Sequence, residues 1–280
     1  MPETPDNTGP TLTWLGTAGL QFQMDGHVLL VDPYYTRLTL AEFVTGRAAS
    51  RDEIIRRHLP LAADAVLITH SHFDHLLDAP VVERLTGATI VGSSTTYNLC
   101  RGRGVPEDRL VIVRGGELLE FGPFRVKVYR SRHSRFLFGR VPLEGEVDHP
   151  ITPKRAWDYR VGPVFIYRIE AGGVSTLVLG SADLEDEALS DARSDILCPC
   201  VAGHQSTHQF LPRILKLCQP KALMPIHYDN FFLPYETGVK ELPGASFRKF
   251  VQLAREEAPL LRAYRPDFFE PLDLRRMAEG

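Results

Sequence analysis

The sequence predicts an α/β (α+β) fold in which two β-sheets pack face to face and helices cover their outer sides. Each half of the chain opens with short β-rich runs separated by glycine turns and continues as strand, helix, strand. Continuous apolar runs that fit buried strands occur in both halves, at 63–70 and 195–201. We expect a single domain over 1–280, because no repeat, low-complexity tract or flexible linker separates the halves.

The first half begins as an antiparallel meander. Three β-rich runs, at 11–16, 20–24 and 27–33, are separated by the turn sequences GTAG and DG. Apolar residues then recur at helical spacing in 51–59. The apolar run 63–70 follows, and its continuous character fits a strand covered on both faces.

A strand–helix–strand unit completes the first half. In 78–87, Pro80 is tolerated in the first turn of a helix, and Gly87 marks the end of that helix. Residues 88–93 read as the next strand. We therefore expect the 63–70 and 88–93 strands to be joined by an intervening helix in a βαβ unit.

The second half repeats this order. A glycine pair at 172–173 indicates the turn of a hairpin. The predicted elements are strands at 109–116, 117–122 and 124–133, a hairpin over 163–183, a strand at 195–201, a helix at 207–218 and a strand at 221–227. The two similar halves lead us to expect two sheets.

Composition limits the classes of function. The formal net charge is −3, so the chain lacks the basic excess of a nucleic-acid-binding protein. The first ten residues contain no signal-peptide pattern, and no stretch approaches a membrane span. We expect a cytoplasmic protein without nucleic-acid or membrane partners. The four cysteines indicate no disulfide framework, and Cys198 and Cys200 fit a buried strand.

The stretch VLITHSHFDHLLD, at 66–78, carries costly polar side chains at the end of an apolar run. Side chains alternate in an extended segment, so His70 and His72 can point to one side and reach one ion. A turn beyond the strand could bring Asp74 and His75 back to the same pocket. Three imidazoles and a carboxylate suit Zn²⁺ or another first-row divalent ion.

This local cluster cannot complete two metal sites by itself. Three more polar residues stand directly after β-rich runs: His133 in VKVYRSRH, Asp183 in LVLGSAD and His227 in LMPIH. Structural roles are the alternative for the last two, because Asp183 could cap a turn and His227 could lie in a solvated loop.

The chain resembles the metallo-β-lactamase superfamily over nearly its whole length. The HxHxDH hallmark of that superfamily stands here at 70–75. The segments WLGTAGLQF, LLVDP, GSAD and PIHYDNF are similar to those of its general metal-dependent hydrolase branch. The resemblance implies a four-layer αββα sandwich of two mixed β-sheets flanked by helices.

The resemblance also implies a binuclear metal site at one edge of the sheets. His70, His72 and His133 would hold one metal, Asp74, His75 and His227 would hold the second, and Asp183 would bridge them. The cofactors would be two divalent ions, zinc first, with manganese or iron as alternatives. A metal-bound hydroxide, oriented by Asp74 as the catalytic residue, would cleave an ester, lactone or phosphodiester bond.

Residues outside the ligand set complete the expected site. Residues 134–160 lack clean periodicity, and long irregular connections are often functional. We interpret this insert as a wall of the substrate pocket, in which Arg135, Arg155 or Trp157 touches the substrate; a merely solvated loop is the alternative. His204 is a further candidate for the pocket lining. Asp32 could orient a ligand histidine or form a turn before Pro33.

Charge and chemistry define the expected partner. Two ions with Asp74, Asp183 and a hydroxide keep one positive charge, which favours an anionic or carbonyl-containing small-molecule substrate. The chain could also form a homo-oligomer. Two alternatives to hydrolysis stay open: a mononuclear iron oxygenase of the persulfide dioxygenase type, and a non-catalytic metal-binding protein.

Overall fold

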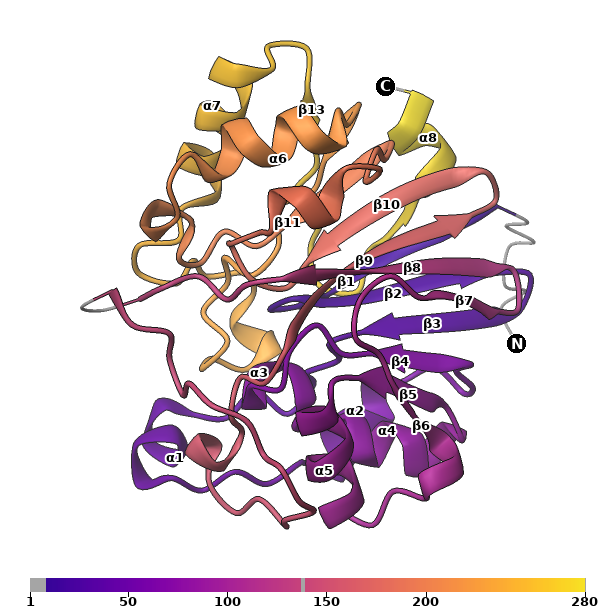
Figure 1. Cartoon of the computed structure of the whole chain (residues 1–280), viewed down its shortest axis with the longest axis vertical. Coiled ribbons are helices and arrows are strands. Elements are labelled where there is room, and N and C mark those ends of the chain that lie inside the picture. The colour runs from indigo at the N-terminus through magenta and orange to yellow at the C-terminus, as the bar shows by residue number, and fades with distance from the viewer. Residues whose placement is uncertain (1–8, 137–138, 280) are drawn as a thin grey trace.

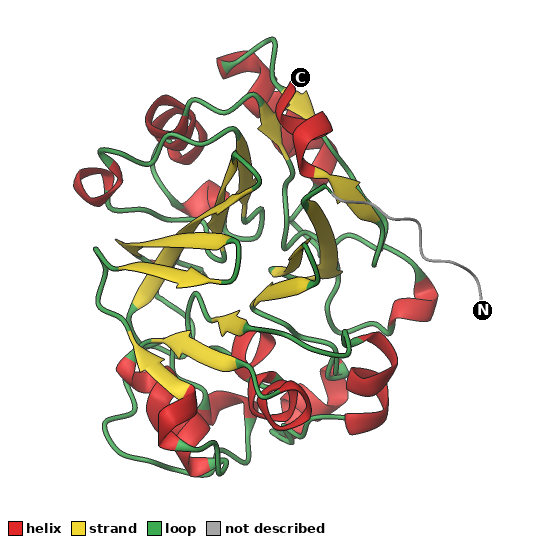
Figure 2. Ribbon diagram, turned by 90° about the vertical axis from the view of Figure 1, so that its right-hand side faces the viewer, coloured by secondary structure: helices red, strands yellow, loops and turns green. Residues whose placement is uncertain are grey.

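The computed structural model describes residues 9–136 and 139–279. These residues form two seven-stranded mixed β-sheets that lie face to face, with helices on the two outer sides (Figure 1; Figure 2). The predicted α/β sandwich is confirmed.

The first sheet combines the N-terminal meander with the first parallel strands. Its order is β14-β1-β2-β3-β4-β5-β6. β14, β1, β2 and β3 pair antiparallel, and β3, β4, β5 and β6 pair parallel. The strands are β1 (Thr11–Gly16), β2 (Gly19–Met24), β3 (His27–Val31), β4 (Ala65–Leu67), β5 (Thr89–Gly92), β6 (Leu110–Ile112) and β14 (Pro271–Asp273).

The second sheet has the same mixed character. Its order is β13-β12-β11-β10-β9-β8-β7, antiparallel from β7 to β10 and parallel from β10 to β13. The strands are β7 (Leu118–Phe121), β8 (Phe124–Ser131), β9 (Val164–Ala171), β10 (Val174–Leu179), β11 (Ile196–Pro199), β12 (Ala222–Leu223) and β13 (Arg262–Ala263).

Helices form the two outer layers. α2, α4 and α5 lie on the outer side of the first sheet, and α6 and α7 lie on that of the second (Figure 1). The helices are α1 (Leu40–Thr45), α2 (Asp52–His58), α3 (Phe73–Leu76), α4 (Ala79–Thr86), α5 (Ser94–Gly102), α6 (Phe210–Cys218), α7 (Phe247–Glu257) and α8 (Leu274–Glu279). Short 3-10 helices occur at Glu107–Arg109, Ala156–Asp158, Asp186–Leu189, His204–Ser206 and Tyr235–Thr237.

Alternating side chains on the strands build two separate cores. Leu29, Val31 and Leu67 point into the core between the sheets. Leu30 and Val66, their neighbours in sequence, point into the core under α2, α4 and α5. Because successive side chains of a strand face opposite sides, a continuous apolar run supplies both cores at once.

Several element boundaries differ from those predicted. The strand predicted over 63–70 is hydrogen-bonded as β4 only at Ala65–Leu67. The helix predicted over 207–218 begins at Phe210, because Gln209 has left-handed backbone geometry with φ 47°. Strand β6, which was predicted as part of the second half, belongs to the first sheet, and β7 belongs to the second; the glycines at 115 and 116 have the positive φ of the turn between them.

Residues 134–160 cross from the second sheet to the helices of the first. Figure 1 shows this segment running from the end of β8 past α1 toward α5. Asn98 of α5 donates through Nδ2 to the Val147 carbonyl (2.7 Å), and Ala48 N donates to the Lys154 carbonyl (3.1 Å). Positions 137 and 138 of the predicted insert lie outside the described residues.

Within 9–136 and 139–279, no helix is both long enough and apolar enough to cross a membrane.

Candidate metal centre

The HxHxDH segment begins where β4 ends. The chain leaves the strand in an irregular turn, which Phe165 N holds to the second sheet by donating to the Thr69 carbonyl (2.8 Å). α3 then starts, with His72 as its N-cap residue. His70 and His72 therefore converge through this anchored turn and not through the alternation of an extended strand, which the sequence had suggested.

Three histidines form the first cluster. His70, His72 and His133 each offer a ring nitrogen, and these three atoms lie within 4.8 Å of one another. The three pairs of ring centroids are all 4.7 Å apart, with interplanar angles of 69° to 82°. The three imidazoles, which follow strands of both sheets, therefore face one small volume.

Hydrogen bonds fix which nitrogen of each ring faces that volume. His72 donates through Nε2 to the Pro142 carbonyl (2.9 Å), and His133 donates through Nδ1 to the Ser134 carbonyl (2.7 Å). A carbonyl only accepts, so these partners assign the tautomers. Nδ1 of His72 and Nε2 of His133 are left with free lone pairs, as metal ligands need.

Asp32 orients a histidine in each cluster. His75 donates through Nδ1 to Asp32 Oδ2 (2.7 Å). The Thr69 hydroxyl donates to the same carboxylate oxygen, so its own oxygen is free to accept from His70 Nδ1 (3.2 Å). The chain of contacts directs Nε2 of His70 and Nε2 of His75 into the site. Asp32 thus stands where the sequence suggested, beside a candidate ligand.

The facing nitrogens of His70 and His72 are placed as two ligands of one cation would be. Nε2 of His70 and Nδ1 of His72 are 3.1 Å apart, and both rings use their other nitrogen as the donor. Two lone pairs at this distance repel each other unless a cation lies between them. Two nitrogens bound to one tetrahedral zinc ion would be about 3.3 Å apart.

The second cluster consists of Asp74, His75 and His227, whose ligand atoms also lie within 4.8 Å of one another. Oδ2 of Asp74 is 3.3 Å from His227 Nε2 and 3.7 Å from His75 Nε2. Nδ1 of His227 is buried without a hydrogen-bond partner. The rings of His70 and His75 have centroids 3.8 Å apart, so the two clusters adjoin.

Burial keeps the first cluster unprotonated. Burial and the neighbouring histidines lower the pKa of His70 well below its usual value. Burial, reinforced by His133, lowers the pKa of His72 to about 3, and burial lowers that of His133 to about 4. Burial would raise the pKa of Asp74, but His75 and His227 bring it below its ordinary value. Neutral imidazoles and an ionised carboxylate are the forms that bind metal.

The loop that carries His227 is held by a buried ion pair. His227 has φ 57°, and its backbone N donates to the Thr17 carbonyl (2.7 Å). Asp229 accepts from Thr17 N (2.8 Å) and from Arg37 Nη2 (2.8 Å), and both charged side chains are almost fully buried. Arg37 Nε also donates to the Leu233 carbonyl (2.6 Å). Sequence analysis missed this pair; the only signal was an Asp two residues after His227.

Gly180 allows β10 to approach Asp32. A Cβ at position 180 would lie 2.1 Å from Thr69 Oγ1 and 2.7 Å from Asp32 Oδ2. Only glycine leaves room for the hydroxyl and carboxylate that orient the two histidines. The sequence analysis treated this glycine as part of a strand end and missed its role.

The structure does not bring Asp183 into either cluster. Its Oδ1 accepts from the Leu184 backbone N (2.8 Å), and it lines a neighbouring cavity with Arg132. β10 ends at Leu179, and the turn that follows places Gly180 and Ser181, not Asp183, beside the site. The expectation of a bridging Asp183 is therefore corrected: Ser181 lines the cavity in its stead, with its Oγ accepting from Ser134 N (3.1 Å).

A cavity of about 680 Å³ opens above the clusters. Ser134, Phe136, Pro142 and Leu143 of residues 134–160 line it, whereas Arg135, Arg155 and Trp157 do not. The lining consists of Phe43, His72, Phe73, Asp74, His75, His133, Ser134, Phe136, Pro142, Leu143, Gly180, Ser181, Cys200, Ala202, His227, Phe231, Phe232, Leu242 and Pro243.

The four predicted pocket residues lie elsewhere. Arg135 lines two adjoining cavities, and its Nη1 donates to the Gly139 carbonyl (3.1 Å). Arg155 lies over the Trp157 ring at 5.4 Å, and that ring packs against the backbone at position 46.

His204, the fourth of these residues, is buried and is not among the residues that line the cavity. It donates through Nδ1 to the Val201 carbonyl (2.7 Å) and packs its ring on Phe250. Its polar group is already used within the scaffold, so it has no free donor for a ligand.

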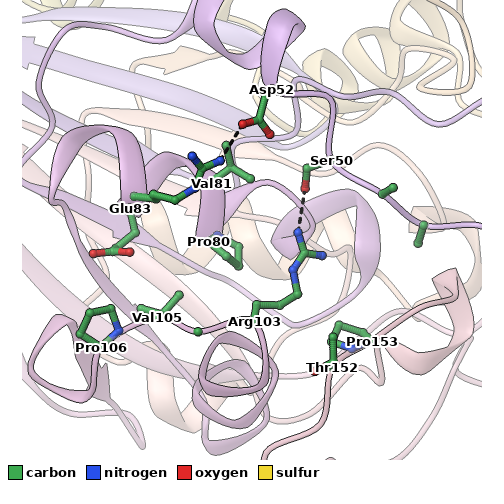
Figure 3. A pocket seen from close by; sticks show the side chains of 14 residues that line it. Ser50, Asp52, Pro80, Val81, Glu83, Arg103, Val105, Pro106, Thr152 and Pro153 are labelled. Atoms are coloured by element: carbon green, nitrogen blue, oxygen red, sulfur yellow. Dashed lines mark hydrogen bonds and ion pairs between the residues drawn. The ribbon is translucent and has the colours of Figure 1, made fainter.

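A second cavity, of about 630 Å³, lies between α2, α4 and α5 (Figure 3). Among its polar lining residues, Arg84 pairs with Asp52 (2.6 Å), and Arg103 reaches toward the Ser50 hydroxyl (3.4 Å). No histidine is among its lining residues. It offers no metal-binding set.

Comparison with known proteins agrees with this geometry. Residues 11–227 match the model of a family described as the beta-lactamase superfamily domain. A UPF0173 metal-dependent hydrolase of Methanopyrus kandleri is 37% identical over 222 residues, covering 79% of this chain and 84% of the relative. One from Roseiflexus castenholzii is 26% identical over 228 residues, covering 79% and 83%.

Among solved structures, Igni18, a metallo hydrolase from Ignicoccus hospitalis, aligns with a TM-score of 0.61 at 19% identity. The alignment covers 95% of this chain and 98% of that one. At this identity the similarity shows a shared fold.

Substitution of the two aspartates separates their roles. Asp74→Asn should lower the zinc bound per chain, because it removes the only charged ligand of the second cluster. Asp183→Asn should leave the bound zinc unchanged, since its carboxylate touches neither cluster. Elemental analysis after dialysis against zinc-containing buffer measures both, and equal losses in the two variants would contradict the geometry.

Asp32→Asn should weaken metal binding without removing a ligand. An orienting partner of a ligand histidine typically contributes about 10- to 100-fold in metal affinity. Competition with a chromophoric chelator measures the dissociation constants. The matched control is Asp64→Asn, whose carboxylate bonds to His27 at the far end of β4; an equal change in both variants would refute the orienting role.

Arg37→Met should destabilise the fold because it leaves the Asp229 carboxylate buried and unpaired. We expect a loss of about 3–5 kcal/mol in the free energy of unfolding. The control Arg84→Met removes an ion pair that is about half exposed and should cost about 0–1 kcal/mol. Urea denaturation measures both, and similar losses would contradict the assigned importance of the buried pair.

Proposed function

The chain belongs to the metallo-β-lactamase superfamily and is a metal-dependent hydrolase, and from this premise we propose that it holds two divalent cations and cleaves an ester, lactone or phosphodiester bond of a small molecule. The observation that carries the proposal is the pair of adjoining three-donor clusters at the floor of one cavity.

The donor groups fit divalent cations. Five imidazoles and one carboxylate suit zinc, and also manganese or iron. The facing lone pairs of His70 and His72 are costly in a buried site unless a cation lies between them. The first cluster, His70, His72 and His133, would hold one ion, and the second, Asp74, His75 and His227, would hold the other.

The cations would lower the pKa of a water molecule from 15.7 toward about 7 and polarise the bond to be cleaved.

The charge of the donor set favours this chemistry. Among the six donor groups only Asp74 carries a negative charge, because the five histidines are neutral as ligands. Asp183 adds none, since it lies outside both clusters. The site would therefore keep an excess of positive charge, which stabilises the negative charge that develops on a carbonyl or phosphoryl oxygen.

The side chains around the site serve the same reaction. The ionised Asp74 carboxylate can accept a hydrogen bond from the attacking water and so orient it toward the substrate. The hydroxyls of Ser134 and Ser181 lie beside each other on the cavity wall and can donate to a substrate oxygen. Aromatic residues above the clusters exclude bulk water, which strengthens these electrostatic interactions.

Turnover that depends on bound metal tests the proposal. Protein purified without chelator should contain zinc, manganese or iron and hydrolyse at least one member of an ester, lactone and phosphodiester panel. Chelation should abolish turnover and metal return should restore it. His72→Ala, which removes one ligand of the first cluster, should lower turnover by at least a factor of about 100.

Two results would contradict hydrolysis. A metal-loaded protein that turns over none of the panel would favour the non-catalytic alternative. Iron content together with oxygen uptake would favour the oxygenase alternative.

A further inference from the structure

The cavity above the metal clusters has an aromatic wall that starts at a candidate ligand. The rings of His227 and Phe231 have centroids 5.3 Å apart, and Phe231 and Phe232 follow at 4.6 Å. Phe43 continues the wall, 5.5 Å from Phe232 and 5.4 Å from Phe73. The aromatic surface therefore begins where a reacting group would sit and extends away from it.

The same cavity contains no positively charged side chain. Of its lining residues in the described part of the chain, none is a lysine or an arginine, and Asp74 is the one carboxylate. Arg135, although close in sequence to the lining residues of the insert, faces two other cavities. Positive charge would therefore come from the proposed cations alone, and a charged group lying along the aromatic wall would be buried without a partner, which is costly.

Apolar side chains continue from the cavity to the surface. Phe136, which lines the cavity, is 51% exposed. On α1, Leu40 is 58% exposed and shares a helix face with Phe43, three positions on, and with Val44, four positions on, which is 68% exposed. Exposed apolar groups beside an apolar cavity give a long substrate chain a path to follow outward.

We propose that the substrate is an uncharged carboxylic ester or lactone whose apolar acyl chain lies along the wall formed by Phe43, Phe231 and Phe232. The proposal rests on the hydrolase function proposed above and narrows its substrate class. The carbonyl group lies at the clusters, and the chain points toward Phe136 and α1.

The reaction balances without a further reagent. The oxygen of one water forms a bond to the carbonyl carbon, and the bond between that carbon and the ester oxygen breaks. The departing oxygen takes one proton and leaves as an alcohol. The acid formed releases its proton to solvent and leaves as a carboxylate.

A series of esters that differ only in chain length tests the proposal. With the metal-loaded protein, kcat/KM for p-nitrophenyl esters should rise from acetate to octanoate, approaching about four-fold for each methylene group that the wall covers. Bis-p-nitrophenyl phosphate, which carries a charge, should be turned over far more slowly. A flat series, or a preference for the phosphodiester, would overturn the substrate class and leave the hydrolase function standing.

Two variants connect the chain-length effect to the wall. Phe232→Ala should flatten the ester series, lowering kcat/KM for octanoate about ten-fold while changing acetate little. The control Phe121→Ala removes a partly buried ring from β7. Phe121 pairs with the first residue of β8, whereas His133 follows the last residue of that strand. The control variant should leave the series unchanged. If Phe232→Ala left the dependence of kcat/KM on ester chain length unaltered, the assigned wall would be contradicted.

Binding to the metal-free protein gives a readout that needs no turnover. Calorimetric titration of chelator-treated protein with 2-hexanone and 2-undecanone should show at least ten-fold tighter binding of the longer ketone, and Phe232→Ala should remove this difference. If no ester is hydrolysed with metal bound, the proposed function fails; a length-dependent ketone affinity would then still support the apolar pocket. Equal affinities for the two ketones would overturn the proposed apolar pocket.

Discussion

One buried carboxylate determines the geometry of both metal clusters. Asp32 is fully buried and accepts hydrogen bonds from His75 and from the Thr69 hydroxyl, which in turn accepts from His70. Each contact fixes the tautomer and the direction of a ring. Gly180 leaves the space for this arrangement, because any side chain there would collide with Thr69 and Asp32. Residues that are not candidate ligands themselves therefore set the positions of the ligand histidines.

The scaffold brings together segments that are far apart in sequence. The turn after β4 and helix α3 supply the first four ligands, the segment after β8 supplies His133, and the loop after β12 supplies His227. The Arg37–Asp229 pair, 192 residues apart, holds the last of these loops against the turn between β1 and β2. His227 and Asp32 have positive φ, a backbone geometry that only such surroundings maintain. Folding and site formation depend on the same contacts.

The sequence predicted what is local or periodic. The spacing of His70, His72, Asp74 and His75 follows from one short turn, and the continuous apolar run at 63–70 predicted a strand covered on both faces. The sequence could not show that Asp183 lies outside the metal clusters, because the path of a two- or three-residue turn after a strand decides which side chain faces the site. Arg155 and Trp157 pair with each other, and composition does not distinguish such a pair from a substrate contact. Long-range partners such as Arg37 and Asp229 carry no pattern at all.

The central claim is that two adjoining donor sets hold cations at the floor of an aromatic cavity. A crystal structure of the zinc-loaded protein, with anomalous diffraction measured at the zinc edge, tests it most directly. The account predicts one peak among His70, His72 and His133 and another among Asp74, His75 and His227. Peaks coordinated by Asp183, or zinc bound only at surface residues, would contradict it.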